Sequence, residues 1–511
     1  MNWLNKIVDE LIELHPEGEI IVSSGVSPSG TYHVGTLREV LTADAVMLEL
    51  RHRGRSSRHI HAADDLDVFR KIPAQVPESF NQYLGRPLCD VPSPDGTDKS
   101  YADFYLNDFL DAAKKIHLDM QVLRFSEQYR SGFMVLAIEK ILADITQVRQ
   151  ILEDISGRQL DDAWSPIQVI EDGYLKKREL VSIDTTAKTI IYVDKDGTEQ
   201  SSSYAHGEVK LDWRLDWPAR WWLLGVHAEP FGRDHATKGG SYDTGAQICR
   251  DIFQAEPPLP VPYHFINRVG ETKKMSKSAG NSISISELSQ VLPAEVIRFF
   301  TLRYTPGKQL FFSESDGVVK LIDEFAELLA KADKSTEDNQ LIRLCMAGVE
   351  SIVSSVPFSH LVASYQAALK DPIKTLEIIA RTEHNTAVDT QRSTIIAELK
   401  FIDEWIKRWA PEDVKFELSE QINIADYTSD QIAFFHSLAD KISAAPADAD
   451  GEWFHKAIYD LKDSSDLETK DLFLSLYQLL IGKSAGPRAG WFLSILPRDW
   501  LMKRLRLEQN P

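Results

Sequence analysis

Residues 23–40 read SSGVSPSGTYHVGTLREV and combine glycines, serines and one imidazole directly before a predicted amphipathic helix. A helix start carries unpaired backbone N–H groups and the positive end of the peptide dipoles, and glycine lets an anion approach the backbone closely. His33 stands where its ring can donate to a phosphate oxygen, and Gly30 and Gly35 keep the backbone accessible. The stretch predicts a phosphate-binding loop. The alternative is an ordinary strand-to-helix turn with a capping serine, since neither common glycine-rich nucleotide motif is present.

A second loop with phosphate-binding chemistry lies roughly 240 residues downstream. Residues 271–284 read ETKKMSKSAGNSIS and follow the strand-like segment PYHFINRV. The segment is a flexible loop rich in lysine, serine and glycine, and a new helix follows it. Lys274 and Lys277, taken singly, are most simply explained as solvated surface lysines. Both loops lie between a predicted strand and a predicted helix, so a single function that uses the two together should explain them.

The elements that must position these loops follow from the apolar pattern. Residues 19–25 form a short buried run that predicts a strand, and the i, i+3, i+4 spacing of apolar residues after His33 predicts a helix packed on a sheet. Residues 56–67 predict a second strand that runs into an acidic loop, and helical patterning resumes near Tyr101. This alternation is typical of a doubly wound parallel α/β sheet of the Rossmann type.

Four segments are expected along the chain. Residues 1–163 form the first half of the α/β domain, and residues 164–205 form a β-rich insertion in which the Asp-Gly of TIIYVDKDG predicts a hairpin turn. Residues 206–313 return to alternating strands and helices and carry the second loop. Residues 314–511 have helical periodicity throughout and predict a separate all-α region.

Composition limits the class of protein. The chain has 511 residues, of which 43% are hydrophobic, so several domains with sizeable cores are expected. It contains no apolar run long enough to span a membrane, its N-terminus is acidic, and its three cysteines form no C-x-x-C pair. These features predict a cytoplasmic protein with no membrane partner. A net charge of −20 means that any nucleic-acid partner must meet a local basic surface.

The two loops together carry a family resemblance. HVGT at 33–36 behind PSG, with KMSKS at 274–278, resembles the paired signature of class I aminoacyl-tRNA synthetases, although Thr36 stands where that family commonly has a histidine. Further segments resemble class I lysyl-tRNA synthetases: DDLDVFRKIP, VKLDWRLDWPARW, FGRDHATKGGSYDTG and IGKSAGPRAGWF. Two alternatives stay open. One is a class I synthetase for glutamate or arginine, and the other is a non-catalytic tRNA-binding paralogue.

The resemblance implies a lysine–tRNA ligase that uses ATP with Mg²⁺ to form lysyl-adenylate and transfers lysine to the 3′ end of tRNA(Lys). It implies catalytic roles for His33, Lys274 and Lys277. It also implies nucleotide contacts from Gly30, His33, Gly35, Thr36, Met275, Ser276, Lys277 and Ser278. The lysine site that it implies comprises Gly25, Ser27, Trp213, His235 and Tyr263, with Asp65 as a further candidate for an ammonium group. Trp213 and Tyr263 are otherwise explained as core aromatics.

The insertion and the C-terminus bear on metal and RNA binding. Relatives often carry cysteine-rich zinc knuckles in the insertion, but here that segment has no cysteine and only His206 follows it, so no structural zinc is expected. Residues 483–506 are basic and interleaved with aromatics, and Arg488, Lys503 and Arg504 are the candidate tRNA contacts. The alternative is a packed terminal helix with a solvated basic face. The oligomeric state stays open, and a monomer is compatible with the sequence.

Overall fold

The computed structural model describes residues 1–97, 100–162, 164–270, 282–419, 421–446 and 449–508. The KMSKS residues, from Lys274 to Ser278, lie outside the described residues. The chain divides into two compact units. The first comprises Met1–Ser289, Ile297–Phe312 and Ser335–Gly348, and the second comprises Gln290–Val296, Ser313–Lys334 and Val349–Pro511. None of the described helices combines the length and the apolar character that a membrane span requires.

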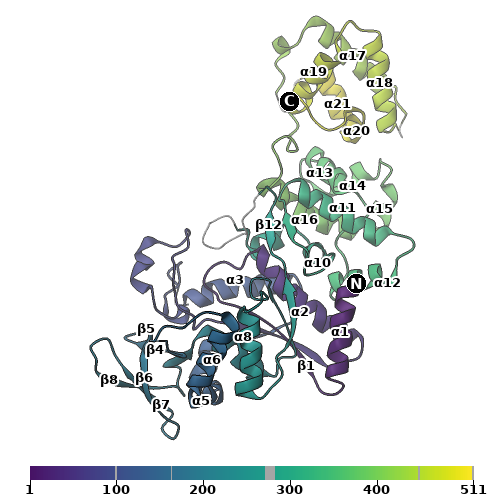
Figure 1. Ribbon diagram of the computed structural model, residues 1–511. Coiled ribbons are helices and arrows are strands. Elements are labelled where there is room, and N and C mark those ends of the chain that lie inside the picture. Colours follow the sequence, from purple (N-terminus) through teal and green to yellow (C-terminus); the bar gives the residue numbers. More distant parts are fainter. Residues whose placement is uncertain (98–99, 163, 271–281, 420, 447–448, 509–511) are drawn as a thin grey trace. The chain divides into compact units, whose positions relative to one another are not determined.

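A five-stranded parallel sheet forms the centre of the first unit (Figure 1). Its strand order is β11-β10-β1-β2-β3, with β11 (Leu259–Tyr263), β10 (Ala228–Gly232), β1 (Ile20–Val26), β2 (Ser57–Ala63) and β3 (Gln121–Arg124). The chain order reverses between β1 and β10, so loops leaving these two strands diverge and leave a crevice at their carboxyl ends. The predicted α/β sheet is confirmed, and this switch point is the expected place for a ligand.

Helices connect and cover these strands. They are α1 (Asn2–Leu14), α2 (Val34–His52), α3 (Tyr101–Lys115), α4 (Phe125–Arg130), α5 (Val135–Ala143), α6 (Ile145–Ser156), α7 (Trp213–Leu224) and α8 (Ser241–Ile248), followed by α9 (Ile285–Val291) and α10 (Ala294–Leu302). A two-stranded parallel pair, β12 (Ile266–Arg268) and β13 (Leu310–Phe312), completes this part.

The helix behind the first loop, α2, is held by buried polar contacts as well as by apolar packing. It packs against β1, β2 and β10. The fully buried guanidinium of Arg298 pairs with the fully buried carboxylate of Asp44. The Arg38 guanidinium donates to the carbonyls of Pro306 and Lys308 at 3.1 and 3.0 Å. Removing either arginine would leave buried acceptors unpaired, so these contacts fix the helix whose first turn follows His33.

The insertion is antiparallel, as the sequence predicts. One sheet pairs β5 (Tyr174–Lys177), β4 (Ile167–Glu171) and β9 (Val209–Leu211), and another pairs β6 (Glu179–Asp184), β7 (Thr189–Val193) and β8 (Glu199–Ser203) (Figure 1). The turn between β7 and β8 contains Gly197 at φ +79°, a conformation that favours glycine, so the Asp-Gly hairpin is confirmed.

The second unit is helical within its described residues. It contains α11 (Asp316–Ala330), α13 (Phe358–Ala367), α14 (Pro372–Ile379), α15 (Asn385–Thr390), α16 (Arg392–Arg408), α17 (Ser429–Ser443), α18 (Gly451–Asp463), α19 (Thr469–Ile481), α20 (Ala489–Ile495) and α21 (Arg498–Leu505). A buried apolar cluster that includes Phe435, Leu472 and Phe492 joins the later helices to α13.

One helix from the predicted all-α segment lies elsewhere. The helix α12 (Thr336–Met346) belongs to the first unit. Its Gln340 amide donates to Asn5 Oδ1 at 2.8 Å, and Arg343 pairs with Glu49 of α2. Helical periodicity alone carries no information about which core a helix joins. The sequence therefore predicts this helix in the all-α region, together with the helices that flank it in the chain.

Candidate active site

A cavity of about 270 Å³ opens at the switch point between β1 and β10. The end of β1 contributes Gly25 and Ser27, β10 contributes Glu229, and α7 contributes Trp213. Ligands in open α/β sheets bind outside the carboxyl ends of the strands, so the cavity lies where this topology places a substrate.

The first loop ends in a histidine cap. His33 is the N-cap residue of α2, and the backbone N–H of Gly35 donates to its Nδ1 at 3.0 Å. Because Nδ1 accepts, the neutral ring carries its proton on Nε2, which makes Nε2–H a donor. A Cβ at Gly35 would lie 2.6 Å from Cε1 of His33. Gly35 therefore makes room for the imidazole itself, a role that differs from the backbone access expected from the sequence.

The chain that leaves the second loop is paired to the first. The N–H of Val34 donates to the carbonyl of Ile283 at 2.9 Å, and the N–H of Ile285 donates to the carbonyl of Tyr32 at 3.0 Å. These bonds form a bridge between His33 and Ser284. The described residues just beyond KMSKS are thus bonded to the HVGT turn, although about 240 residues separate the two motifs.

The five residues expected to bind lysine all line the cavity: Gly25, Ser27, Trp213, His235 and Tyr263. The rings of Trp213 and His235 meet edge to face, with centroids 5.8 Å apart. Tyr263 is buried, and its hydroxyl donates to Glu39 Oε2 at 2.7 Å. The cavity wall is aromatic on one side, which suits a cation lying against a ring face.

Asp65 is the candidate that the structure does not bring to the cavity. Its carboxylate accepts from the backbone N–H and the hydroxyl of Ser126 at 2.7 and 2.6 Å. Ser126 lies in the first turn of α4, so Asp65 satisfies a helix N-terminus. Its neighbour Asp64 lines the cavity instead. An acidic cluster in a loop does not reveal which member faces the cavity, and the structure gives no support to the expected ammonium contact of Asp65.

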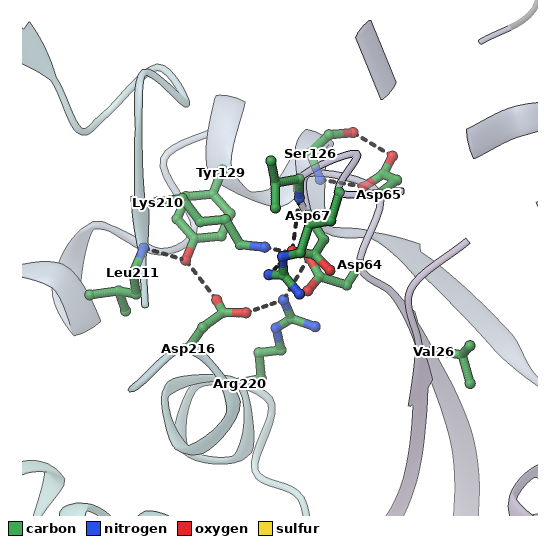
Figure 2. Close-up of polar contacts among 12 residues, drawn as sticks. Val26, Asp64, Asp65, Asp67, Ser126, Tyr129, Lys210, Leu211, Asp216 and Arg220 are labelled. Carbon is green, nitrogen blue, oxygen red and sulfur yellow. Dashed lines mark hydrogen bonds and ion pairs between the residues drawn. The ribbon is translucent and has the colours of Figure 1, made fainter. Parts of the chain in front are cut away.

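Asp64 belongs to a buried charge network (Figure 2). Its Oδ1 lies 2.8 Å from Lys210 Nζ and 3.1 Å from the Arg220 guanidinium, which also pairs with Asp216. The Tyr129 hydroxyl donates to Asp216 at 2.6 Å. Burial alone would raise the pKa of Asp64, but Arg220 and Lys210 outweigh it and lower that pKa to about 2. Two carboxylates here balance two cations, so the network stiffens the wall without adding net charge.

Two other carboxylates in the wall have a different environment. Glu39 accepts from the backbone N–H of Gly25 at 2.7 Å as well as from Tyr263. Glu229 is buried and accepts from the indole N–H groups of Trp217 and Trp221 at 3.0 and 2.5 Å. Burial raises the pKa of Glu229 to about 7, against the opposing effect of the two indoles. A ligand cation beside Glu229 would favour its ionised form.

Sequence reasoning missed Glu39 and Glu229. Glu229 carried a detectable signal, because it is a charged residue within the strand-like segment HAEPFG, whose pattern predicts burial. Glu39 carried none, because it lies about 200° around the helix from Leu37, on the side away from the i, i+3, i+4 apolar residues. A buried carboxylate needs a hydrogen-bond or charge partner, so such positions are site candidates.

Comparison with known proteins agrees with this geometry. The family described as tRNA synthetases class I (K) matches residues 1–347. The lysine–tRNA ligase 1 of Methanosarcina acetivorans is 35% identical, over 99% of this chain and 98% of that protein. The lysine–tRNA ligases of Archaeoglobus fulgidus and Thermococcus kodakarensis are each 33% identical, over 99% of this chain and 99% and 100% of those proteins.

The chain belongs to the class I lysyl-tRNA synthetases. It is a lysine–tRNA ligase of class I by similarity over its full length, and the identification made from HVGT and KMSKS is confirmed. The open alternatives of a glutamate or arginine enzyme and of a non-catalytic paralogue are not supported. The excess of carboxylates in the synthetase's cavity agrees with a cationic amino acid and not with glutamate.

Several basic side chains in the C-terminal stretch of the synthetase make hydrogen bonds or ring contacts within the fold. Arg504 is buried, and its guanidinium donates to the carbonyl of Gln421 at 3.1 Å and lies over the Trp500 ring. Arg498 donates to the carbonyl of Ala445 at 3.2 Å, and Lys483 donates to the carbonyls of Glu412 and Lys415. Arg504 is therefore engaged within the fold, and the structure gives no support to its expected RNA contact.

Arg488 and Lys503 differ from these neighbours because both side chains are exposed. Arg488 is the N-cap residue of α20, and Lys503 lies in the last turn of α21. A basic residue in this stretch can either pack within the fold or contact RNA. Burial of its side chain distinguishes the packing role from RNA binding. Arg488 and Lys503 stay candidate RNA contacts.

Proposed function

We propose that the synthetase activates lysine in the cavity between β1 and β10 and that the HVGT and KMSKS loops hold ATP above it. The lysine carboxylate attacks the α-phosphorus, the bond to the pyrophosphate oxygen breaks, and lysyl-adenylate forms. A ribose hydroxyl at the 3′ end of tRNA(Lys) then attacks the lysyl carbonyl, and AMP leaves. The observation that carries this proposal is an aromatic, carboxylate-lined cavity at the carboxyl ends of β1 and β10, with Ser27 and Glu39, on either side of the His33 turn in sequence, in its lining.

The cavity implies an orientation for lysine. Glu229 precedes the carboxyl end of β10 by three residues, which places it roughly 10 Å below the edge of the sheet. The His33 turn follows β1 at that edge. The reacting carboxylate must therefore face the edge, and the side-chain ammonium extends inward to Glu229. The face of Trp213 or Tyr263 adds a cation–π contribution of about 1–2 kcal/mol.

Glutamate and arginine fit this site poorly for different reasons. A glutamate side chain would place a third carboxylate beside Glu39 and Glu229, and like charges in a buried site cost several kcal/mol. Arginine carries a planar guanidinium with five donors, which demands a forked acceptor. The two oxygens of Glu229 each accept one indole N–H already, which leaves acceptor sites for the compact ammonium but fewer than a guanidinium with five donors requires.

The phosphate contacts follow from the first loop. His33 Nε2–H is the proposed donor to a phosphate oxygen of ATP, and Lys277, with Lys274, supplies positive charge as pyrophosphate leaves. Gly30 and Thr36 are proposed to contact the nucleotide through the backbone, together with Met275, Ser276 and Ser278. No side-chain nucleophile is needed, because positioning and charge stabilisation supply the catalysis. Mg²⁺ is expected to arrive with ATP and to be held by phosphates and water.

The helical unit is the proposed anticodon-binding region, with Arg488 and Lys503 on its RNA-facing surface. We further propose that the protein works in the cytoplasm. Activation is expected to need tRNA, as in the glutamyl- and arginyl-type enzymes that the chain resembles.

Aminoacylation with purified protein tests this function. Charging of tRNA(Lys) should occur with lysine and ATP, and glutamate and arginine should fail at matched concentrations. ATP–pyrophosphate exchange measured with and without tRNA separates activation from transfer. Equal or better charging with glutamate or arginine would contradict the proposed use of the cavity.

A further inference from the structure

A second cluster of potential ligands lies within the helical unit. His360, Glu383 and His384 each offer one donor atom, and these atoms all lie within 4.8 Å of one another. Nε2 of His384 lies 3.7 Å from Oε1 of Glu383. All three residues line a cavity of about 680 Å³, together with Trp491 and Arg488.

The buried member of this cluster has an unsatisfied nitrogen. His360 is 93% buried, and its Nε2 has no hydrogen-bond partner among the residues that the structure describes. Its ring is held edge to face against His384 and Trp491, with centroids 4.6 and 4.9 Å away. A buried imidazole nitrogen without a partner costs free energy unless something binds it.

The donor set identifies the ligand class. Two imidazole nitrogens and one carboxylate oxygen are the three-ligand set of many Zn²⁺ sites, which leave a fourth position for water. Tetrahedral bonds of about 2.1 Å place donors about 3.4 Å apart. The 3.7 Å pair is close to this spacing, and Glu383 can adjust because its side chain is 71% exposed.

We propose that His360, Glu383 and His384 bind one Zn²⁺ ion and that this ion fastens the start of α13 to the segment before α15. His360 lies in the first turn of α13, and His384 is the N-cap residue of α15. The ion would also fix the His360 ring against Trp491 of α20. The expectation of a zinc-free protein rested on the cysteine-free insertion, and this site lies elsewhere in the chain.

Metal analysis and calorimetry on the full-length protein test this proposal. After removal of metal with a chelator and dialysis, titration with ZnCl₂ should show one site per chain with a micromolar or tighter Kd. His384→Ala and Glu383→Gln should each weaken binding at least tenfold. His436→Ala, at an exposed position on α17, is the matched control and should bind as the parent does. Saturating Zn²⁺ should raise the Tm of the parent by about 5–10 °C.

The test relies on variants at partly exposed positions, because these changes disturb folding less than a change at a buried residue. His360→Ala removes a buried ring and can unfold the unit, so the conclusion rests on Glu383→Gln and His384→Ala, checked by circular dichroism. Failure of the parent to bind Zn²⁺, or unchanged binding by a folded His384→Ala, Glu383→Gln double variant, would overturn the proposal. Because the readouts are metal content, Kd and Tm, they stay independent of aminoacylation.

Discussion

Glu229→Gln is the change that tests the lysine site most sharply. Glutamine keeps the shape of the side chain but cannot carry the negative charge that the side-chain ammonium of lysine requires. It also replaces one acceptor oxygen with an NH₂ group opposite an indole N–H of Trp217 or Trp221. Weaker lysine binding is expected, together with a modest loss of stability.

The size of the effect follows from the burial of this carboxyl. Losing one partner of a buried, charge-assisted hydrogen bond costs about 3 kcal/mol. Because the pKa of Glu229 is about 7, half of the free protein must lose a proton before it binds the cation at pH 7, which costs the parent about 0.4 kcal/mol. The net loss is roughly 2.5 kcal/mol, or about 70-fold in lysine affinity.

Ionisation of Glu229 makes both the affinity for lysine and the stability of the ligand-free protein depend on pH. Between pH 6 and pH 8 the carboxyl of Glu229 ionises, so the Kd of the parent for lysine should fall about tenfold. Its pKa in the folded protein is above the unfolded value of 4.5, so its contribution to stability without ligand is full below about pH 4.5 and is lost as the pH rises through 7. Glu229→Gln should flatten both profiles.

Calorimetry with lysine and with norleucine, which lacks the side-chain ammonium, is the assay. If Glu229 contacts that ammonium, the variant loses affinity for lysine and keeps its affinity for norleucine. Trp221→Phe is the control, because it removes one indole donor to Glu229 without removing the charge. An equal loss for both amino acids in Glu229→Gln, or a lysine Kd within threefold of the parent, would refute the assignment.

Four further changes separate structural from functional roles. Gly35→Ala should lower ATP–pyrophosphate exchange as much as His33→Ala, at least 100-fold, because the added Cβ displaces the imidazole. Loss of the His33 cap should cost either variant about 0.5–2 kcal/mol of stability, and additive losses of exchange activity in the double variant would contradict this reasoning. Asp65→Asn should lower stability by about 1–2 kcal/mol in denaturant titrations and leave the KM for lysine unchanged. Lys277→Ala should reduce kcat about 100-fold with little effect on lysine affinity, and loss of folding alone would make the loop structural. Lys503→Gln should flatten the salt dependence of tRNA binding by up to about one unit at unchanged Tm, whereas Arg504→Gln should lower Tm; the reverse pattern would restore Arg504 as the RNA contact.

The parallel sheet and the antiparallel insertion were predictable because local patterns determine them. Apolar runs with period 2 or 3.6 identify strands and helices, and the Asp-Gly pair identifies the turn before β8. The strand order was not predictable beyond its class, because the pairing of β1 with β10 joins residues about 200 positions apart. The same limit explains α12, whose contacts with Asn5 of α1 and Glu49 of α2 carry no local signature.

The candidate site was predictable where a motif named its residues. Trp213, His235 and Tyr263 line the cavity as expected, because each stands inside a segment that resembles the family. Asp65 binds the first turn of a helix and Arg504 binds a backbone carbonyl, because a charged residue can make such contacts as readily as it can bind a ligand. Burial decides between these roles, and burial depends on tertiary packing.

The central claim is that the cavity between β1 and β10 holds lysine with its side-chain ammonium at Glu229 and its carboxylate toward His33. A crystal structure with a non-hydrolysable lysyl-adenylate analogue tests it directly. The account predicts the ammonium within hydrogen-bond distance of the Glu229 carboxylate and the adenylate phosphate beside His33 Nε2. An analogue bound with its ammonium away from Glu229, or outside this cavity, would contradict it.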